Sequence, residues 1–83
     1  MSQRDLVHVM NALADAARAE AGVGVPVAVI DRAIGRGKGD MRTPLNLGSL
    51  EDEGLVQQTG DGEWALTEAG VQRLRDDAQL SNQ

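Results

Sequence analysis

The sequence predicts an α+β fold that is mainly helical, and three observations support this prediction. Residues 4–21 are rich in alanine and free of glycine and proline, a composition that favours a helix. Thr43-Pro44 is a strong helix start, because threonine caps the first turn and proline at the first helical position loses no hydrogen bond. Residues 55–59 and the alternating residues 63–66 flank Gly60-Asp61-Gly62, which is typical of two strands joined by a tight turn.

A first helix is predicted over Arg4–Ala21, ended by Gly22 and Gly24. Its apolar residues recur at spacings of three and four, so one face is expected to be buried. Val7 and Ala14 lie beside this face and widen the apolar surface, which indicates contact with a second copy of the chain. The face itself comprises Leu6, Val9, Met10, Leu13, Ala16 and Ala17.

The next segment is expected to be extended and then helical. Residues 23–27 are β-branched but interrupted by Pro26, which predicts a short edge strand or an extended entry into a helix. Residues 35–39 contain three glycines and two cations, and the backbone entropy of glycine favours a flexible basic turn there. The second helix is predicted between them, over about Val27–Ile34, with an apolar face of Val29, Ile30, Ala33 and Ile34.

A third helix is predicted over Thr43–Glu53, with Thr43 as its N-cap and Gly54 at its end. Successive residues of a helix are rotated by about 100°, so its positions can be divided between the core and the surface. The core side would hold Thr43, Leu47, Leu50 and Gly54, the outward side Arg42, Leu45, Ser49, Asp52 and Glu53, and the flanks Asn46 and Gly48.

A hairpin and a last helix complete the predicted order. The strands would be residues 55–59 and 63–66, with Trp64 and Leu66 on one face. Thr67 is expected to cap the last helix, whose apolar positions are Val71, Leu74 and Ala78. The 83 residues of the chain give room for one small core, so we expect one domain over residues 1–80 and a frayed tail at 81–83.

Composition excludes several classes of function. The chain has no cysteine and a single histidine, His8, so disulfides and thiolate or imidazole metal sites are not expected. No nucleophile–base pair stands out, and we predict no enzyme activity, no catalytic residue, no metal and no cofactor. No apolar run approaches the roughly 18–20 residues of a membrane span, and no signal-peptide pattern opens the chain. A cytoplasmic protein without membrane contact is therefore expected.

Residues 47–70 carry a motif with three parts. They are Leu47-Gly-Ser-Leu50-Glu-Asp-Glu-Gly54-Leu55-Val56, a glycine-containing hairpin, and Trp64-Ala-Leu66-Thr67-Glu68-Ala-Gly70. This motif resembles the winged helix-turn-helix domains of MarR- and PadR-type transcriptional regulators. The resemblance implies a winged helix, with a three-helix core, a β-hairpin wing and a C-terminal helix. It also implies a DNA-binding regulator whose third helix enters the major groove.

Charge is unevenly distributed along the chain. The net charge is −5, which opposes non-specific nucleic-acid binding. Residues 32–42, however, hold four cations and one acid, so this window carries +3 and the rest of the chain −8. On double-stranded DNA, the expected contacts are Arg32, Arg36 and Lys38 with phosphates, and Arg42, Thr43, Leu45, Asn46 and Ser49 on the side of the bases.

A protein partner is the alternative to DNA. The third helix ends in Glu51-Asp52-Glu53, and the wing carries Asp61 and Glu63 without a cation. An outward Leu45 also fits a protein interface, where an apolar anchor is ringed by polar groups. Winged helices serve as interaction modules as well as DNA readers. In either case a homodimer through the first and last helices is expected, because so small a core gains stability by pairing.

Overall fold

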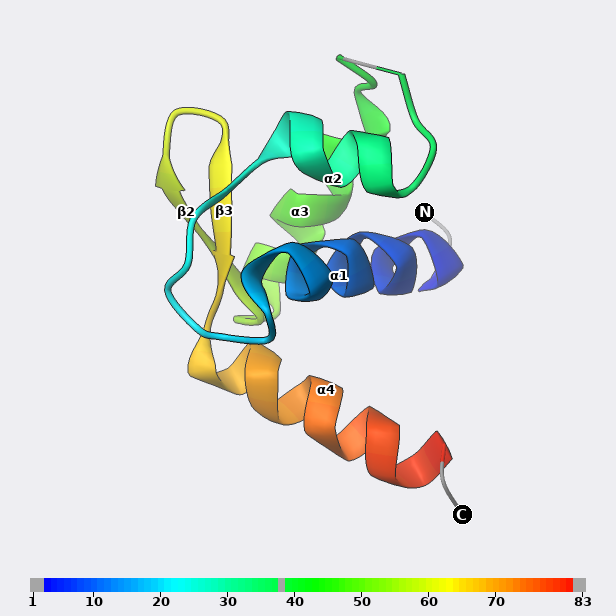
Figure 1. Ribbon diagram of the computed structural model, residues 1–83, viewed down its shortest axis with the longest axis vertical. Coiled ribbons are helices and arrows are strands. Elements are labelled where there is room, and N and C mark those ends of the chain that lie inside the picture. The colour runs from blue at the N-terminus through cyan, green and yellow to red at the C-terminus, as the bar shows by residue number, and fades with distance from the viewer. Residues whose placement is uncertain (1–2, 38, 82–83) are drawn as a thin grey trace.

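The computed structural model of the protein describes residues 3–37 and 39–81. Within those residues the fold is α+β and mainly helical, as predicted, with four helices and a small antiparallel sheet (Figure 1). The helices are α1 (Gln3–Ala17), α2 (Val27–Ala33), α3 (Arg42–Asp52) and α4 (Glu68–Ser81), and the strands are β1 (Val25–Pro26), β2 (Val56–Gly60) and β3 (Glu63–Leu66).

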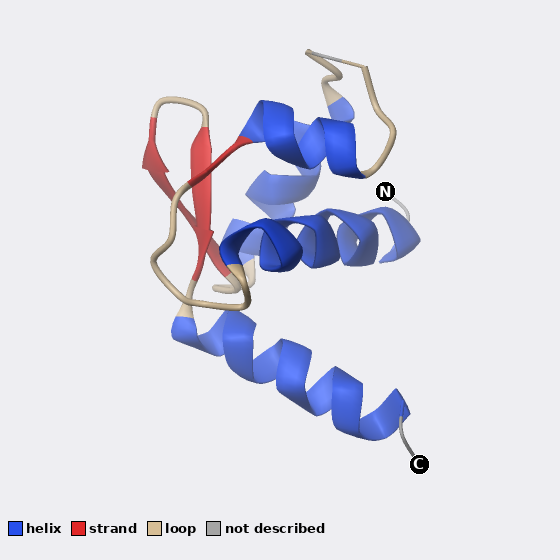
Figure 2. Ribbon diagram, in the orientation of Figure 1, coloured by secondary structure: helices blue, strands red, loops and turns tan. Residues whose placement is uncertain are grey.

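The sheet lies to one side of α1, α2 and α3 (Figure 2). Its order is β1–β3–β2, and both pairings are antiparallel. Val25 pairs with Trp64 across the first pairing, so β1 is the short edge strand that Pro26 predicts. The predicted hairpin is confirmed: β2 and β3 pair in register from Val56 and Leu66 up to Gln58, where the register shifts before the turn.

The core forms where the buried face of α1 meets α3, α2 and the sheet. Val9, Leu13 and Leu47 are fully buried, together with Ile30 and Leu66. Each such aliphatic side chain contributes about 1.5–3 kcal/mol by leaving water, so these residues account for much of the stability of a small domain. The predicted face of α1 differs in two positions, because Ala16 is exposed and Ala12 is buried.

The first helix is shorter than predicted, ending at Ala17 and not at Ala21. Arg18 and Ala19 adopt positive φ angles of 55° and 57°, and the amide of Ala19 donates to the carbonyl of Ala14 at 2.8 Å. The chain then reaches the sheet, where Ala21 forms a parallel bridge with Leu66. Pairing of Ala21 with the sheet therefore ends the helix earlier than the helix propensity of this alanine-rich segment predicts.

The second helix buries a different face from the one predicted. Ile30 is buried, but Val29 and Ala33 are exposed and Ile34 is half-buried. Asp31 is buried instead, with only 2% of its surface exposed. An acid in this position needs hydrogen-bond donors from its neighbours, and α3 supplies one of them.

The third helix begins one residue earlier than predicted, and its cap is also different. Thr43 lies inside α3 and its hydroxyl donates to Asp31, so the prediction of Thr43 as the N-cap is wrong. The N-cap residue is Met41, whose side chain makes no capping hydrogen bond. The carboxylate of Asp40, one residue earlier, accepts the amide of Arg42 at 2.9 Å, as in an Asx turn. Leu47 and Leu50 are buried as expected, whereas Gly54 is exposed and ends the helix with a positive φ of 78°.

The last helix begins as predicted. The hydroxyl of Thr67 accepts the amide of Gly70 at 3.0 Å and donates to the carbonyl of Gly54 at 2.6 Å. From this cap α4 runs diagonally away from α1, α2 and α3 (Figure 1), and Val71 and Leu74 pack against the core only in part. The side chain of Ala78 and most of the predicted tail at 81–83 lie outside the described residues.

Candidate functional site

The outward face of α3 presents a narrow stripe of side chains. Arg42, Leu45 and Ser49 follow one another at spacings of three and four, which places them on one face of a helix. Leu45 is 61% exposed, and Met41 just before the helix is 78% exposed. The outward placement of Arg42 and Leu45 agrees with the prediction, while Ser49 is half-buried and makes an interaction of its own. The stripe therefore combines a cation with apolar groups.

Behind this stripe, Arg36 turns inward. Its Nη1 donates to the hydroxyl of Thr43 at 3.0 Å and to Oδ1 of Asn46 at 2.9 Å. Its Nη2 lies 3.8 Å from a carboxylate oxygen of Asp5 on α1, and the side chain is only 8% exposed. Thr43 and Asn46 are themselves buried, at 0% and 1% exposure. Three of the predicted DNA-contacting residues are thus joined to one another inside the protein.

The inward position of Asn46 follows from the geometry of α3. Asn46 lies one turn from Thr43 and from Leu50, both of which are buried, so the flank that it occupies faces α2. The guanidinium of Arg36 satisfies its side-chain oxygen there, which offsets the cost of burying a polar group. As placed here, Asn46 and Thr43 do not reach the surface.

Arg42 is exposed but held by a neighbour. Its Nε and Nη2 donate to the two carboxylate oxygens of Asp40 at 3.0 and 2.7 Å. These side-chain hydrogen bonds, followed by the one from the backbone amide of Arg42, hold the pKa of Asp40 at about 2. The same contact raises the pKa of Arg42. Asp40 thus stays ionised at neutral pH and neutralises the cation of the stripe.

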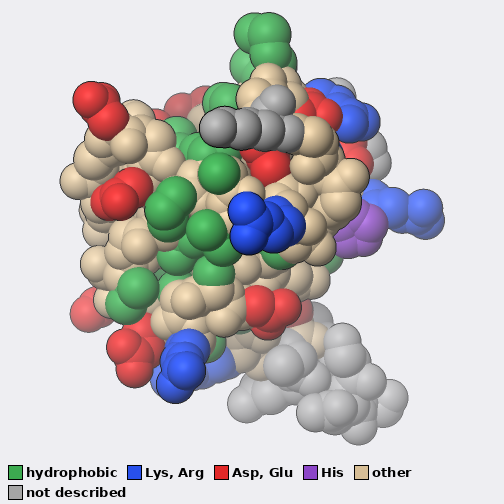
Figure 3. Space-filling model, turned by 45° about the horizontal axis from the view of Figure 1, so that its top comes forward, with side chains coloured by type: hydrophobic (Ala, Val, Ile, Leu, Met, Phe, Trp, Pro, Cys, Tyr) green, Lys and Arg blue, Asp and Glu red, His purple; other side chains and the backbone are tan. Residues whose placement is uncertain are grey.

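The described cations lie apart from one another on the face around α3. On the face that Figure 3 shows, arginine side chains lie as separate groups, interspersed with Asp and Glu. Arg32 is exposed on α2, and Lys38 lies outside the described residues. Asp61 and Glu63 are exposed at the end of the hairpin. Among the described residues, Arg32 is therefore the predicted phosphate contact that lies exposed at the surface.

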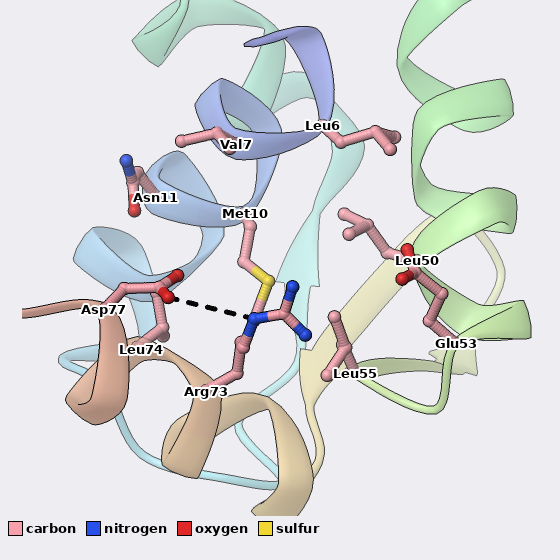
Figure 4. A pocket seen from close by; sticks show the side chains of 10 residues that line it. All are labelled: Leu6, Val7, Met10, Asn11, Leu50, Glu53, Leu55, Arg73, Leu74 and Asp77. Atoms are coloured by element: carbon pink, nitrogen blue, oxygen red, sulfur yellow. Dashed lines mark ion pairs between the residues drawn. The ribbon is translucent and has the colours of Figure 1, made fainter. Parts of the chain in front are cut away.

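An apolar groove lies on another side, between α1, the end of α3 and α4 (Figure 4). It encloses about 80 Å³, and the side chain of Met10 extends from α1 toward α4 within it. Arg73 and Asp77 form an ion pair of 3.8 Å on its α4 side. Two further polar side chains, Asn11 and Glu53, line the groove, and the remaining lining residues are apolar: Leu6, Val7, Leu50, Leu55 and Leu74.

Sequence reasoning missed three residues, Asp40 and Met41 beside the outward face of α3 and Asp31 in the interior. Asp40 had a readable pattern, since an aspartate side chain commonly accepts the backbone amide two residues later in the chain. Met41 had none, because an apolar residue beside a glycine-rich turn is compatible with burial or exposure. Asp31 had none either, because its donor, Thr43, is twelve residues away in the sequence.

Comparison with known proteins found no matching family model, no matching curated protein and no matching solved structure. Within residues 3–37 and 39–81, no group of three or more His, Cys, Asp or Glu side chains could hold a metal ion. In the same part of the chain, every helix is too short or too polar to cross a bilayer.

Proposed function

We propose that the protein is a winged-helix DNA-binding protein that acts as a transcriptional regulator. The order α1, β1, α2, α3, β2, β3, α4 and the strand order β1–β3–β2 support the winged helix. In such a fold α3 is the recognition helix and the β2–β3 hairpin is the wing. The resemblance of residues 47–70 to MarR- and PadR-type regulators, drawn from the sequence, points the same way.

The exposed stripe on α3 carries this proposal. Arg42 suits the acceptors of guanine and Leu45 suits the methyl group of thymine, and both project from the outward face. Arg32, which is exposed on α2, would contact phosphate. Lys38, the other cation proposed for phosphate, lies outside the described residues. Arg36, Thr43 and Asn46 are removed from the set of contacts, because their polar atoms are used inside the protein.

Titration of a labelled random-sequence duplex pool tests the proposal. Binding at ~50 mM salt should weaken steeply at ~200 mM, because released counterions drive the interaction. Arg32→Ala should lower the steepness of the log–log salt dependence by about 0.9, the value for one lost phosphate contact, whereas Arg42→Ala should weaken binding by about 1–3 kcal/mol through its lost base contact. Arg75→Ala on α4 is the control for net charge, and it should bind as the wild type does. Absence of binding at low salt would overturn the DNA proposal.

A protein partner is the second candidate, and one observation favours it. Met41 and Leu45 form an exposed apolar pair, four residues apart, beside an Arg42 that Asp40 already neutralises. Such an exposed apolar pair suits an apolar patch on a protein partner. A photo-cross-linking residue in place of Leu45 decides between the candidates in cells. DNA adducts support the first function, and protein adducts support the second.

We further propose that the protein forms a homodimer through the groove between α1 and α4. The rim of the groove carries charges of both signs, Arg73 on α4 and Glu53 at the end of α3. In an interface with two-fold symmetry a contact between Arg73 of one copy and Glu53 of the other would form twice, beside the Arg73–Asp77 ion pair within each copy. Val7 borders the groove and is 48% exposed, which is surface that a second copy would cover.

Sedimentation velocity of two matched variants tests the homodimer. Val7→Glu places a charge in the groove and should convert the dimer to a monomer at micromolar concentration. Val29→Glu makes the same change on α2, where Val29 is similarly exposed at 42%, and should leave the dimer intact. A wild-type protein that sediments as a monomer at high micromolar concentration would contradict the proposal.

A further inference from the structure

Four polar side chains connect α2, the turn after it and the start of α3, and a fifth, Asp5, lies near them on α1. Arg36, in the turn after α2, contacts Thr43 and Asn46 on α3 and lies near Asp5 on α1. Thr43 in turn donates to Asp31 on α2. The hydroxyl of Thr43 therefore accepts a hydrogen bond from Arg36 and donates one to Asp31, so it lies between the two charged groups. We call Asp31, Arg36, Thr43 and Asn46 the polar network.

The polar network is built into the interior. Asp31, Thr43 and Asn46 are each at most 2% exposed, and the side chain of Arg36 is 8% exposed. Buried charges are strongly unfavourable unless hydrogen-bonded partners surround them. Oδ2 of Asp31 has no hydrogen-bond partner within the described residues, so the stabilisation of this acid depends on its other oxygen and on the positive charge nearby.

Arg36 is also fixed by its backbone. Its amide donates to the carbonyl of Asp31 at 2.8 Å, and the amide of Gly35 donates to Arg32 at 3.2 Å. Gly35 has a φ of 76°, which favours glycine and turns the chain back toward α3. The backbone at the end of α2 therefore places the guanidinium of Arg36 beside the first turn of α3. There it adds a side-chain contact between two helices that the chain connects through a glycine-rich turn.

We propose that Arg36 is a positioning residue, which fixes α3 against α1 and α2 and does not itself bind DNA phosphate. The planar guanidinium is required, because Nη1 serves two acceptors while Nη2 faces Asp5. A lysine could place a charge there but would not reproduce the two-pronged geometry. This inference rests on the proposed function only in naming α3 as the helix whose placement matters.

Variants of two neighbouring arginines separate the roles. Arg36→Lys keeps the charge and loses the geometry, so its Tm should fall by roughly 5–10 °C. Its affinity for duplex DNA should fall about tenfold at a temperature where it is fully folded, with the salt slope unchanged. Arg32→Ala is the control, and it should keep the wild-type Tm while its salt slope weakens by about 0.9. Arg36→Lys with the wild-type Tm and affinity would overturn the proposal.

Arg36→Ala removes the charge and tests phosphate contact directly. Positioning predicts a larger loss of Tm than for Arg36→Lys and an unchanged salt slope at temperatures where the variant is folded. A salt slope weakened by about 0.9 with an unchanged Tm would identify Arg36 as a phosphate ligand and would overturn the proposal. If Arg36→Ala does not fold, the comparison between Arg36→Lys and Arg32→Ala still decides.

Amide hydrogen exchange tests the inference without any DNA. In Arg36→Lys, exchange should accelerate by an order of magnitude at the amides of residues 45–48, while β2 and β3 keep their wild-type protection. Acceleration of equal size across α3 and the sheet would show a loss of global stability only, and would overturn the positioning role. If the wild type binds no DNA, the proposed function fails, and this exchange pattern alone decides the role of Arg36.

Discussion

Asp40 and Arg42 show how a carboxylate at the start of α3 affects the surface beside it. The carboxylate receives three hydrogen bonds from Arg42, two from the guanidinium and one from the backbone amide. Backbone amides at a helix start and a guanidinium are also the donors that bind phosphate. A DNA phosphate in this position must therefore displace Asp40 from groups that it already satisfies.

Titration of Asp40 provides the first prediction. Its pKa of about 2 depends first on the side-chain hydrogen bond from Arg42, so Arg42→Ala should raise the pKa toward the ordinary aspartate value of about 3.9. Since the folded pKa is the lower one, the contact stabilises the fold above pH ~4 and is lost as pH falls toward 2. Carboxyl carbon chemical shifts of Asp40 measure the midpoint. An equal midpoint in wild type and Arg42→Ala would contradict the assignment of cause.

Two glycines on helices provide a matched pair for the second prediction. A Cβ at Gly70 would lie 2.1 Å from the backbone oxygen of Leu55, whereas one at Gly48 would meet nothing within 4 Å. Gly70→Ala should therefore lower the free energy of unfolding by roughly 2–4 kcal/mol. Gly48→Ala should raise it by about 0.5–1 kcal/mol, because alanine loses less backbone entropy in a helix. Urea denaturation measures both, and a Gly70→Ala variant as stable as Gly48→Ala would contradict the packing shown here.

At the scale of elements, Thr67 joins three of them. It follows β3, caps α4 through the amide of Gly70, and reaches back to Gly54 at the end of α3. Loss of a threonine cap costs about 1–2 kcal/mol, so Thr67→Ala should lower the free energy of unfolding by that amount. Thr67→Ser keeps the hydroxyl and should recover most of the loss. Thermal unfolding measures the series, and equal losses for alanine and serine would assign the effect to the methyl group.

Elements that depend on local chemistry could be predicted from the sequence, and those that depend on distant partners could not. The turn at Gly60–Gly62 predicted the hairpin correctly, and Thr67 predicted the start of α4. Both predictions succeeded because turns and caps involve residues that are neighbours in the chain. The end of α1 was misplaced, since Ala21 leaves the helix to pair with Leu66, far along the sequence. The N-cap of α3 was misassigned for a related reason: the hydroxyl of Thr43 is used by Asp31 of α2.

The candidate site was predicted less well than the fold. Helical periodicity placed Arg42 and Leu45 outward correctly, but it assigned Asn46 to a flank without showing which neighbour that flank faces. Arg36 was expected at the surface because cations in glycine-rich turns are usually solvated. Its burial depends on acceptors supplied by α3 and on Asp5 of α1. A single sequence contains no local pattern that records such a set of contacts.

For the whole molecule, the distribution of charge limits how DNA can bind. The net charge of −5 repels a polyanion over most orientations, and the field of surface charges decays over about 10 Å at 0.1 M salt. Binding through α3 would bring the β2–β3 hairpin to the DNA backbone if the hairpin acts as a wing. Asp61 at its turn would then lie near phosphates and weaken the complex. The α4 helix is at the other end of the long axis of the molecule (Figure 1), where acids would matter much less.

Charge reversal at these two ends tests the orientation. Asp61→Lys and Asp76→Lys change the net charge equally, so any difference between them reports position and not total charge. In the proposed complex, Asp61→Lys should strengthen duplex binding at ~50 mM salt by about tenfold and steepen the log–log salt dependence by about 0.9, the value for one new phosphate contact. Asp76→Lys should strengthen binding less than threefold, with its slope unchanged. Equal effects at both positions would place the hairpin away from the DNA and would contradict its role as a wing, even if α3 binds.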